Sequence, residues 1–521
     1  MSTKLLRLQC IQNDCNQTFS NFTYFRIHLE KQHRVNRNQN EVNTFSSISS
    51  PRCLLHKNVT SLENNNSSTK SIETSNKDIY VVERVNTFKK KALSLSLNLH
   101  NQNSMPRKSS FNSNRFCRSC TRTKAEIKRD AIENIEYLRN KTNYQEDLLE
   151  NNFQETGIKS CCIFNDLNFF HITENFCYDL MHDIFEGVCI YDICHILLAL
   201  INDNILTLNV INNRKALFQF RELEIGNRSA PIDIGRLKKF NLKMTAREVE
   251  CFVHFLPLMI GDLVPHDNEH WKLLTLLLEI IDFLLKSKYV IDELINLQTL
   301  IKKHNLLYIK LYGELKPKHH FLVHYATAIR KCGPLKYVWS MRFEAKHKEA
   351  KMYFNNITSR TNPPYSLSVK SSIKFAKFLL DRENAFEPII NFDECHYEDL
   401  TTDEYNSLLK LIQDDNIILK NTKILNTVTY KGTIYKKNYY LAAYKNAFKL
   451  FKIKFFLYHT DIIHVVCYPI YIKKFCKHFQ SHEVGSKIDS VIIKNISTFF
   501  SPPLHLYSVN NGKTYVRAKY I

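Results

Sequence analysis

The spacing of apolar residues changes once along this chain, and the change limits the folds that the chain can adopt. From about residue 175 to residue 312, apolar side chains recur every three or four positions, the period of helices that bury one face. Beyond about residue 420 they alternate with polar residues or form β-branched and aromatic runs, as in strands. The sequence therefore predicts an α+β chain, with a mostly helical region at 113–400 and a small β domain of five to seven strands at 401–521.

Local signals support several individual helices. Thr245 stands at an N-cap position and Glu248 follows three residues later, which is the capping-box spacing. Residues 115–155 have apolar side chains at helical spacing among dense charge, so helix is expected there too. Further helices are predicted at 270–286, 290–312, 341–356 and 366–381.

The charge balance points to a class of partner. The 521 residues include 72 Lys and Arg against 51 Asp and Glu, a formal net charge of +21. Such a surplus favours a polyanion such as nucleic acid, although many basic proteins only have solvated lysine faces. All ten glycines are isolated, so the chain has neither G-x-G-x-x-G nor a P-loop. A nucleotide cofactor in a glycine-rich cradle is therefore not expected.

Compartment signals are negative for secretion and for the membrane. The N-terminus lacks the apolar region and small-residue cleavage site of a secretory signal. The most apolar stretches, 193–201 and 273–285, are too short or carry charge, so no membrane span is expected. Fifteen cysteines in such a chain favour thiols and metal ligands over disulfides. Together with the basic charge, these features predict an intracellular, nuclear protein.

The first 34 residues contain a metal-binding pattern, C-x4-C-x12-H-x4-H. Its four members are Cys10, Cys15, His28 and His33. Two thiolates and two imidazoles suit tetrahedral zinc, and Phe19 and Phe25 stand where the core of a small ββα unit needs them. Residues 8–34 therefore resemble a two-Cys, two-His zinc finger, which places a zinc-finger domain at 1–34. So small a unit needs its metal in order to fold.

The finger's role is less constrained than its metal. In that family the base-contacting helix positions would fall on Asn21, Thr23, Tyr24 and Ile27. Only an asparagine amide has an obvious bidentate edge, and one finger covers about three base pairs. DNA contact, protein docking and a purely structural role all stay open. Residues 35–112 are rich in Asn and Ser with weak apolar periodicity, which predicts a disordered linker.

A second set of cysteines and histidines is spread over 200 residues. Cys117 and Cys120 form C-x2-C, and His319 and His324 have H-x4-H spacing. Together they would complete a tetrahedral zinc site. His320 is the competing ligand, since a slip of one residue changes the choice. Alternatively, the cysteines are a redox pair and the histidines are helix-face or core residues.

Acidic and basic groups gather around Glu344. Residues 316–351 contain nine Lys or Arg and two Glu, and Lys346 and Lys348 follow Glu344 directly. A carboxylate there forms a solvated ion pair, or holds Mg²⁺ against a nucleic-acid phosphate while the cations hold the strand. Upstream, Asp179 and His182 combine hard and imidazole ligands at a predicted helix start, where caps and surface groups are more common.

In combination, the segments TENFCYDLMHDIFEGVCIYD, LKPKHHFLVHY and VWSMRFEAKHK resemble the C-terminal two-thirds of CACTA-like (En/Spm-type) DNA transposases of animal genomes. The resemblance covers about residues 115–521. It implies an RNase H-like catalytic fold of the DDE type, split by a large all-α insertion. It also implies zinc ligation by Cys117, Cys120, His319 and His324, a third catalytic acid at Glu344 and a D-x-x-H motif from Asp179 to His182.

The other two catalytic acids of such an enzyme are missing. DDE chemistry uses three carboxylates to hold two Mg²⁺ ions, and the first two should precede Cys117. Asp14 lies within the finger, Asp78 lies in the linker, and Glu83 is the only acid between Asp78 and Cys117. The RNase H-like region is therefore expected to be incomplete, Glu344 to be vestigial, and strand transfer to be lost.

The predicted β domain is strongly basic. Ten Lys and one Asp lie between residues 431 and 477, interleaved with aromatic residues. Lys449, Lys452 and Lys454 fall in one such run, which suits a surface that follows nucleic-acid phosphates. The alternative is a β-barrel with its aromatic side chains in the core and its lysines in solvent.

The sequence thus predicts a zinc-binding and DNA-binding protein derived from a DNA transposase, without strand-transfer activity. One or two Zn²⁺ ions are expected, and Mg²⁺ only if catalysis remains. An active Mg²⁺-dependent transposase or nuclease is the first alternative, and a zinc-finger protein-interaction module is the second. The oligomeric state is not constrained by the sequence.

Overall fold

The computed structural model describes residues 112–380 and 422–518, apart from short gaps within these ranges. Outside these ranges it also describes residues 402 and 406 and three strands. The gaps are 221, 223, 359–360, 445–446, 460–461, 500–501 and 511. The chain divides into two compact units, Met1–Asp78 and Ile79–Ile521. Of the first unit, the structure describes an antiparallel ladder of β1 (Leu8–Gln9) and β2 (Thr18–Phe19).

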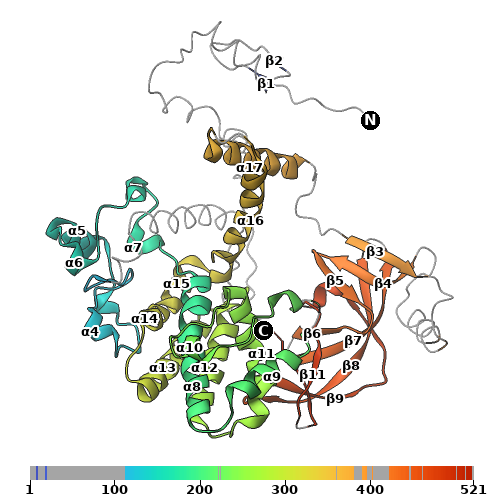
Figure 1. Ribbon diagram of the computed structural model, residues 1–521. Helices are drawn as coiled ribbons and strands as arrows, with labels where there is room; N and C mark the ends of the chain where they lie inside the picture. Colours follow the sequence, from blue (N-terminus) through green and yellow to red (C-terminus); the bar gives the residue numbers. More distant parts are fainter. Residues whose placement is uncertain are drawn as a thin grey trace, which may run out of the picture. The chain divides into compact units, whose positions relative to one another are not determined.

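The second unit is mixed helix and sheet, with a helical region followed by a curled antiparallel sheet (Figure 1). The helices are α4 (Lys124–Ile127), α5 (Lys141–Glu150), α6 (Phe153–Thr156), α7 (Ile172–Asn175), the π-helix η5 (Met181–Val188), α8 (Cys189–Asn202), α9 (Leu208–Leu217), α10 (Ile234–Leu237), α11 (Ala246–Ile260), α12 (Glu269–Leu284), α13 (Glu293–Tyr312), α14 (Pro317–Val323), α15 (Tyr325–Cys332), α16 (Met341–Asn356) and α17 (Pro363–Leu380).

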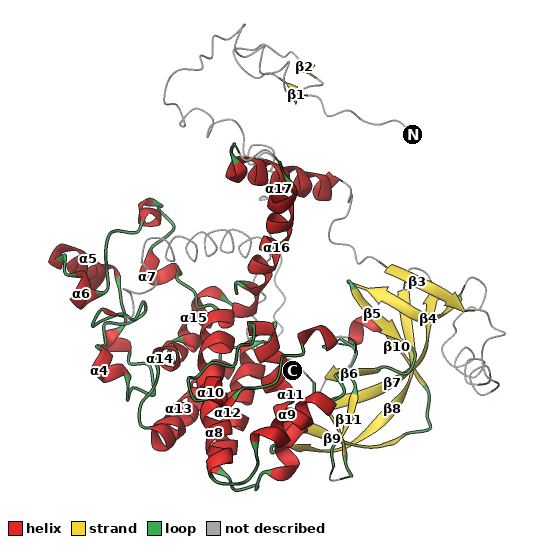
Figure 2. Ribbon diagram, viewed as in Figure 1, coloured by secondary structure: helices red, strands yellow, loops and turns green. Residues whose placement is uncertain are grey.

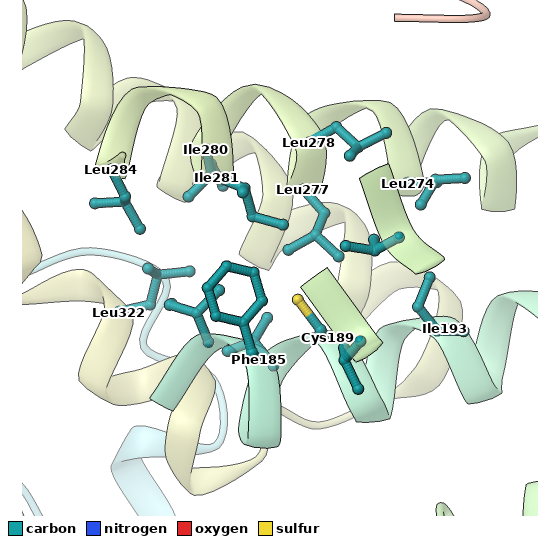
Figure 3. Close-up of a cluster of buried hydrophobic side chains, with 14 of the residues drawn as sticks. Phe185, Cys189, Ile193, Leu274, Leu277, Leu278, Ile280, Ile281, Leu284 and Leu322 are labelled. Atoms are coloured by element: carbon teal, nitrogen blue, oxygen red, sulfur yellow. The ribbon is translucent and has the colours of Figure 1, made fainter. Parts of the chain in front are cut away.

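The helical region is built around α12, which packs between α8 and α13. In Figure 3, Leu277 and Leu284 of α12 face Phe185 and Cys189 from η5 and α8, with Leu322 of α14 beside them. None of these five side chains is more than 1% exposed. Each buried aliphatic or aromatic side chain contributes about 1.5–3 kcal/mol, so this core holds the helices that carry the site described below.

Several helix predictions are confirmed. The capping box of Thr245 and Glu248 begins α11, with each side chain bonded to the other's backbone N–H. The helices α16 and α17 match the predictions at 341–356 and 366–381 closely.

The prediction of helix over 115–155 is wrong for much of that segment. Helix there is limited to the single turns α4 and α6, to α5 and to a 3₁₀ turn at Ile135–Tyr137. Cys120 and Leu138 form an isolated antiparallel bridge. Buried Arg139 donates hydrogen bonds to the carbonyl oxygens of Cys117 and Thr156. These long-range contacts fold the segment back on itself and override its local helical pattern.

The sheet is drawn in yellow in Figure 2. Its order is β11-β12-β9-β8-β7-β4-β3, while β10 pairs with β8, β5 with β4 and β6 with β7. The strands are β3 (Ile390–Cys395), β4 (Lys423–Tyr430), β5 (Thr433–Lys436), β6 (Tyr440–Tyr444), β7 (Phe448–His459), β8 (Ile462–Cys476), β9 (Ser481–Lys487), β10 (Ile492–Asn495), β11 (Leu506–Ser508) and β12 (Thr514–Val516).

This ten-stranded sheet is larger than the predicted five to seven strands, and it includes β3, which precedes the predicted boundary at residue 401. The strand β9, with the sequence SHEVGSK, escapes prediction because it lacks apolar alternation. Every strand pair among the described residues is antiparallel. The predicted RNase H-like part is not confirmed by these strands and stays a prediction.

The sheet shares a core with the helices. The indole Nε1–H of Trp271, on α12, donates a 3.0 Å hydrogen bond to the carbonyl oxygen of His478. Phe479 and Tyr515 belong to the main helical core cluster. At Gly261, an added Cβ would lie 3.0 Å from the Phe479 ring, so a larger residue there would press against that ring.

One continuous helix, Met181–Asn202, is long and apolar enough to cross a membrane by length and composition. In the fold, 61% of its apolar window is buried against other elements. This burial is typical of the core helix of a folded domain, and the helix gives no clear indication of a membrane protein.

Candidate metal centre

Four side chains capable of binding a metal meet in the helical region. They are Cys117, Cys120, His320 and His324, all of them buried, and their ligand atoms lie within 4.8 Å of one another. Cys117 Sγ lies 3.5 Å from His324 Nε2, and Cys120 Sγ lies 3.3 Å from His320 Nε2. The two Nε2 atoms are 3.4 Å apart.

These distances fit one tetrahedral ion. With Zn–S bonds of about 2.3 Å and Zn–N bonds of about 2.05 Å, a tetrahedron separates sulfur from nitrogen by about 3.6 Å and nitrogen from nitrogen by about 3.4 Å. The separations in the cluster are close to these values. Two sulfur and two nitrogen donors also form a common zinc set, so the cluster could hold a metal ion and is compatible with Zn²⁺.

The cysteine side of the cluster is held by backbone contacts. The N–H of Ser119 lies 3.4 Å from Cys117 Sγ, which favours a thiolate there. Arg139 Nε donates a 2.9 Å hydrogen bond to the Cys117 carbonyl. The Arg139 guanidinium is itself paired with Asp147 in a buried ion pair. The C-x2-C loop is therefore fixed by a charged anchor that sequence spacing alone does not reveal.

The histidine side comes from two short consecutive helices. Pro317 occupies the first turn of α14, where a missing N–H costs nothing. His320 lies on α14, and His324 lies at its junction with α15. Residues four apart on a helix share a face, which brings both imidazoles to the cysteine loop.

The donor groups hold protons in the absence of metal. Burial opposes ionisation of the Cys117 thiol, but its hydrogen bond with Cys120 and the nearby imidazole of His324 lower its pKa well below the usual value. The same hydrogen bond, together with burial, raises the pKa of Cys120. Burial disfavours the charged imidazole of His324, yet Cys117 and Glu133 outweigh it and raise its pKa to about 9. A metal ion that enters at pH 7 must therefore displace protons from Cys120 and His324.

The predicted ligand His319 is corrected to His320. The ring of His319 points to a different partner, because its Nε2 lies 2.8 Å from Asp192 Oδ1. On a helix, positions 319 and 324 are about 140° apart around the axis, whereas 320 and 324 are about 40° apart. Recognising KPKHHFLVH as helical would have favoured His320 from the sequence alone.

Asp192 holds two histidines in the centre of the helical core. Its other oxygen, Oδ2, lies 2.6 Å from His304 Nε2, and all three side chains are fully buried. Burial opposes ionisation of Asp192, but His304 and His319 lower its pKa to about 2. Burial likewise opposes the charge on His304, and Asp192 overcomes it and raises the His304 pKa. Burial lowers the pKa of His319, so the pKa values of the two imidazoles that flank the carboxylate are shifted in opposite directions.

The predicted D-x-x-H motif and Glu344 meet at η5. Asp179 Oδ2 lies 2.6 Å from His182 Nδ1 and also accepts a hydrogen bond from Ser340. His182 Nε2 faces Glu344 Oε1 at 3.3 Å and Glu186 Oε2 at 3.8 Å. The hydrogen bond to Asp179 raises the pKa of His182. The group is therefore a cluster of three carboxylates around His182, whose protonation they favour. Within the described part of the chain, only the Cys–His set brings three or more potential ligand atoms within 4.8 Å of one another.

Most of the predicted phosphate-contacting lysines are accessible. Lys346 and Lys348 are exposed on α16, and Lys449 is exposed on β7. Lys452 is partly exposed on the same strand.

Lys454 is an exception, with 5% of its surface exposed. Its Nζ lies 5.2 Å from the centre of the Tyr468 ring. The register of β7 against β8 shifts between Ile453 and Phe455, so a bulge breaks the alternation on which the prediction rested. The assignment of Lys454 to a phosphate-contacting surface is therefore corrected.

The predicted finger ligands and base-contacting positions lie outside the described residues. The described pair β1–β2, with Leu8 opposite Phe19, lies where the hairpin of a ββα unit would begin. The finger itself stays a prediction for Cys10, Cys15, His28 and His33, and for Asn21, Thr23, Tyr24 and Ile27.

No known protein family, curated protein or solved structure matches this chain.

Replacement of Asp192 by Asn tests the buried network. Asn keeps the shape but removes the anion that stabilises charged His304, and breaking a buried ion pair costs about 3–5 kcal/mol. Because the pKa of His304 is raised in the folded state, His304 contributes stability that is fully present below its ordinary pKa of 6.5. This contribution is lost as the pH rises through the pKa of His304 in the folded state. The Asp192→Asn variant should therefore lose more stability at pH 5 than at pH 8. The Asp192 carboxylate has its own contribution in place above about pH 4, so it does not alter this comparison.

Urea unfolding followed by tryptophan fluorescence measures this effect, because both tryptophans, Trp271 and Trp339, lie in the helical region. Asp267→Asn, at an exposed loop position, is the control and should change little at either pH. Equal losses of stability at pH 5 and pH 8 would show that the Asp192–His304 pair is not ionised.

Proposed function

We propose that this protein binds Zn²⁺ at Cys117, Cys120, His320 and His324 as a structural ion. The observation that carries the proposal is the buried convergence of two thiols and two imidazoles at ligand spacing. Structural zinc sites use four protein ligands, whereas catalytic ones keep a position open for water or substrate. A fully buried set of four donors favours the structural role.

The ion would fasten a loop to the helical core. The cysteines belong to the irregular segment between Asn112 and α5, and the histidines belong to α14 and its junction with α15. The partners in each Cys–His contact are separated by 207 and 200 residues in sequence. Zinc would therefore hold the 112–140 segment against the core that the other helices form.

We further propose that the zinc-bound protein binds DNA and derives from a CACTA-like DNA transposase without strand-transfer activity. The support is the net charge of +21, the exposed lysines of α16 and β7 and the motif resemblance given above. Lys346 and Lys348 are suited to phosphate contact, because both side chains are exposed on α16.

A metal-dependent nuclease is the second candidate. It is favoured by the placement of Glu344 and Glu186 near the same atom, His182 Nε2, with both carboxylates at least 40% exposed. It is disfavoured by the raised pKa of His182, which favours a cation beside the carboxylates, and by the absence from the sequence of suitable partner aspartates before Cys117.

Metal analysis tests the zinc proposal. The purified full chain should contain about two zinc ions, one in the predicted finger and one in the helical region. The Cys10→Ser/Cys15→Ser variant, here called the finger-silenced chain, should keep one, and the Cys117→Ser/Cys120→Ser variant should also keep one. A finger-silenced chain without bound zinc would exclude the proposed site.

Salt dependence tests DNA binding. Affinity for a random-sequence duplex should fall steeply between 50 and 200 mM salt, because each phosphate contact releases about 0.9 counterion. Lys346→Gln/Lys348→Gln should flatten the slope by roughly 2, measured by fluorescence anisotropy. The control Lys302→Gln/Lys303→Gln removes two exposed lysines of α13 and should leave the slope unchanged. Salt-insensitive binding contradicts phosphate contact.

A nicking assay separates the two candidates. Supercoiled plasmid incubated with the protein and Mg²⁺ or Mn²⁺ should stay intact, and Glu344→Gln should behave identically. If the natural chain nicks the plasmid and the Glu344→Gln variant does not, the nuclease is established and the proposal that the protein lacks catalytic activity is refuted.

A further inference from the structure

The two imidazoles of the cluster have different surroundings. Nδ1 of His324 lies 2.7 Å from Glu133 Oε1, while the other oxygen of Glu133 accepts a hydrogen bond from the Thr327 hydroxyl. Nδ1 of His320 is buried, and no hydrogen-bond partner reaches it among the residues that the structure describes. One imidazole is thus held from behind by a carboxylate, and the other is not.

We propose that Glu133 is the positioning residue of this metal centre, which makes His324 the anchoring imidazole and His320 the ligand that is released first. The inference rests on the proposed zinc function and adds an order of strength among its ligands.

The support of His324 acts on its ligand atom. A carboxylate at Nδ1 fixes the proton on that nitrogen, so the lone pair stays on Nε2 and becomes more basic. His324 Nε2 is the atom that faces Cys117 Sγ and His320 Nε2. The ring is also stacked parallel to Tyr178, with an interplanar angle of 9°. The orientation of His324 is therefore set before a metal arrives.

The Glu133 carboxylate is itself well placed for this task. Its side chain is 6% exposed, so solvent does not weaken the bond to His324. One of its oxygens contacts His324 Nδ1 and the other accepts the Thr327 hydroxyl, so both oxygens have partners. His324 lies at the α14–α15 junction and Thr327 lies in the first turn of α15, so Glu133 joins the cysteine segment to the histidine helices independently of the metal.

His320 has no equivalent support. Its ring stands nearly perpendicular to that of His324, at 87°, and Nε2 of His320 contacts Cys120 and His324. A buried imidazole N–H without an acceptor loses a hydrogen bond that water would supply. Release of His320 from the metal therefore breaks fewer hydrogen bonds than release of His324. If His324 moved away, the buried Glu133 carboxylate would also lose its hydrogen bond to Nδ1.

The first test removes the charge of Glu133 in the finger-silenced chain. Glu133→Gln keeps the shape and should lower zinc affinity about 10- to 100-fold, measured by competition with a chromophoric chelator. Glu136→Gln changes an exposed acid on the same segment and should leave the affinity unchanged. Unchanged affinity in Glu133→Gln would overturn the role of Glu133.

The second test compares the two histidines directly. In the finger-silenced chain, His320→Ala should bind zinc at least tenfold more tightly than His324→Ala, because three anchored ligands remain and water takes the fourth position. Cobalt substitution adds a spectroscopic readout, since His320→Ala should keep its thiolate-to-cobalt absorption and His324→Ala should lose much of it. Equal losses in the two variants would overturn the proposed order.

A readout of folding distinguishes positioning from simple stabilisation. Glu133→Gln should lower the melting temperature of the metal-free chain, because the contact with His324 exists without metal, and the rise in melting temperature produced by zinc should shrink in addition. An equal drop in both states would assign Glu133 a purely structural role. If the finger-silenced chain itself binds neither zinc nor cobalt, the zinc function fails, and this inference fails with it.

Discussion

Two sulfur and two nitrogen atoms from opposite ends of a 200-residue stretch converge in one buried cluster, and this convergence depends on the packing of the helical core. Bringing distant segments together costs conformational entropy, but the cost grows only slowly with the length of the loop. The intervening chain also folds into the core around α12, which already places α14 close to the segment that carries the cysteines. The core therefore assembles the ligand set, and a metal ion needs only to hold it.

Consecutive histidines serve two separate polar groups in this core. His319 turns toward Asp192 and His320 turns toward Cys120, because neighbouring positions on a helix differ by about 100° around the axis. Asp192, His304 and His319 come from α8, α13 and α14, so their hydrogen bonds set the positions of three helices relative to one another. A sliding movement of α14 would disturb both groups at once.

The sequence predicts those features that depend on local chemistry. The capping box at Thr245 and the strand over residues 423–430 match the structure, since each follows from neighbouring residues. The C-x2-C pair and His324 were identified as potential ligands because metal donors at regular spacing are uncommon. Whether zinc occupies them, and whether the chain binds DNA, are still predictions.

What the sequence misses depends on distant partners. Residues 115–155 have a helical pattern, but the buried Arg139 and the Cys120–Leu138 bridge impose turns. The alternation of residues along β7 predicts that Lys454 is exposed, but a bulge in the strand turns its side chain inward. Glu133 carries no motif at all, and only the folded chain shows that it lies against His324.

The contact between Trp271 and the backbone of His478 has a consequence for how this protein could change in evolution. The sheet contributes Phe479 and Tyr515 to the core of the helices, and Gly261 leaves room for that approach. A recombination event that exchanged residues 422–518 for another domain would leave a buried indole without its acceptor and an open gap beside α11. Packing therefore ties the helical and β-rich parts to each other, despite the change in apolar spacing that separates them, so replacement of one part would require changes in the other.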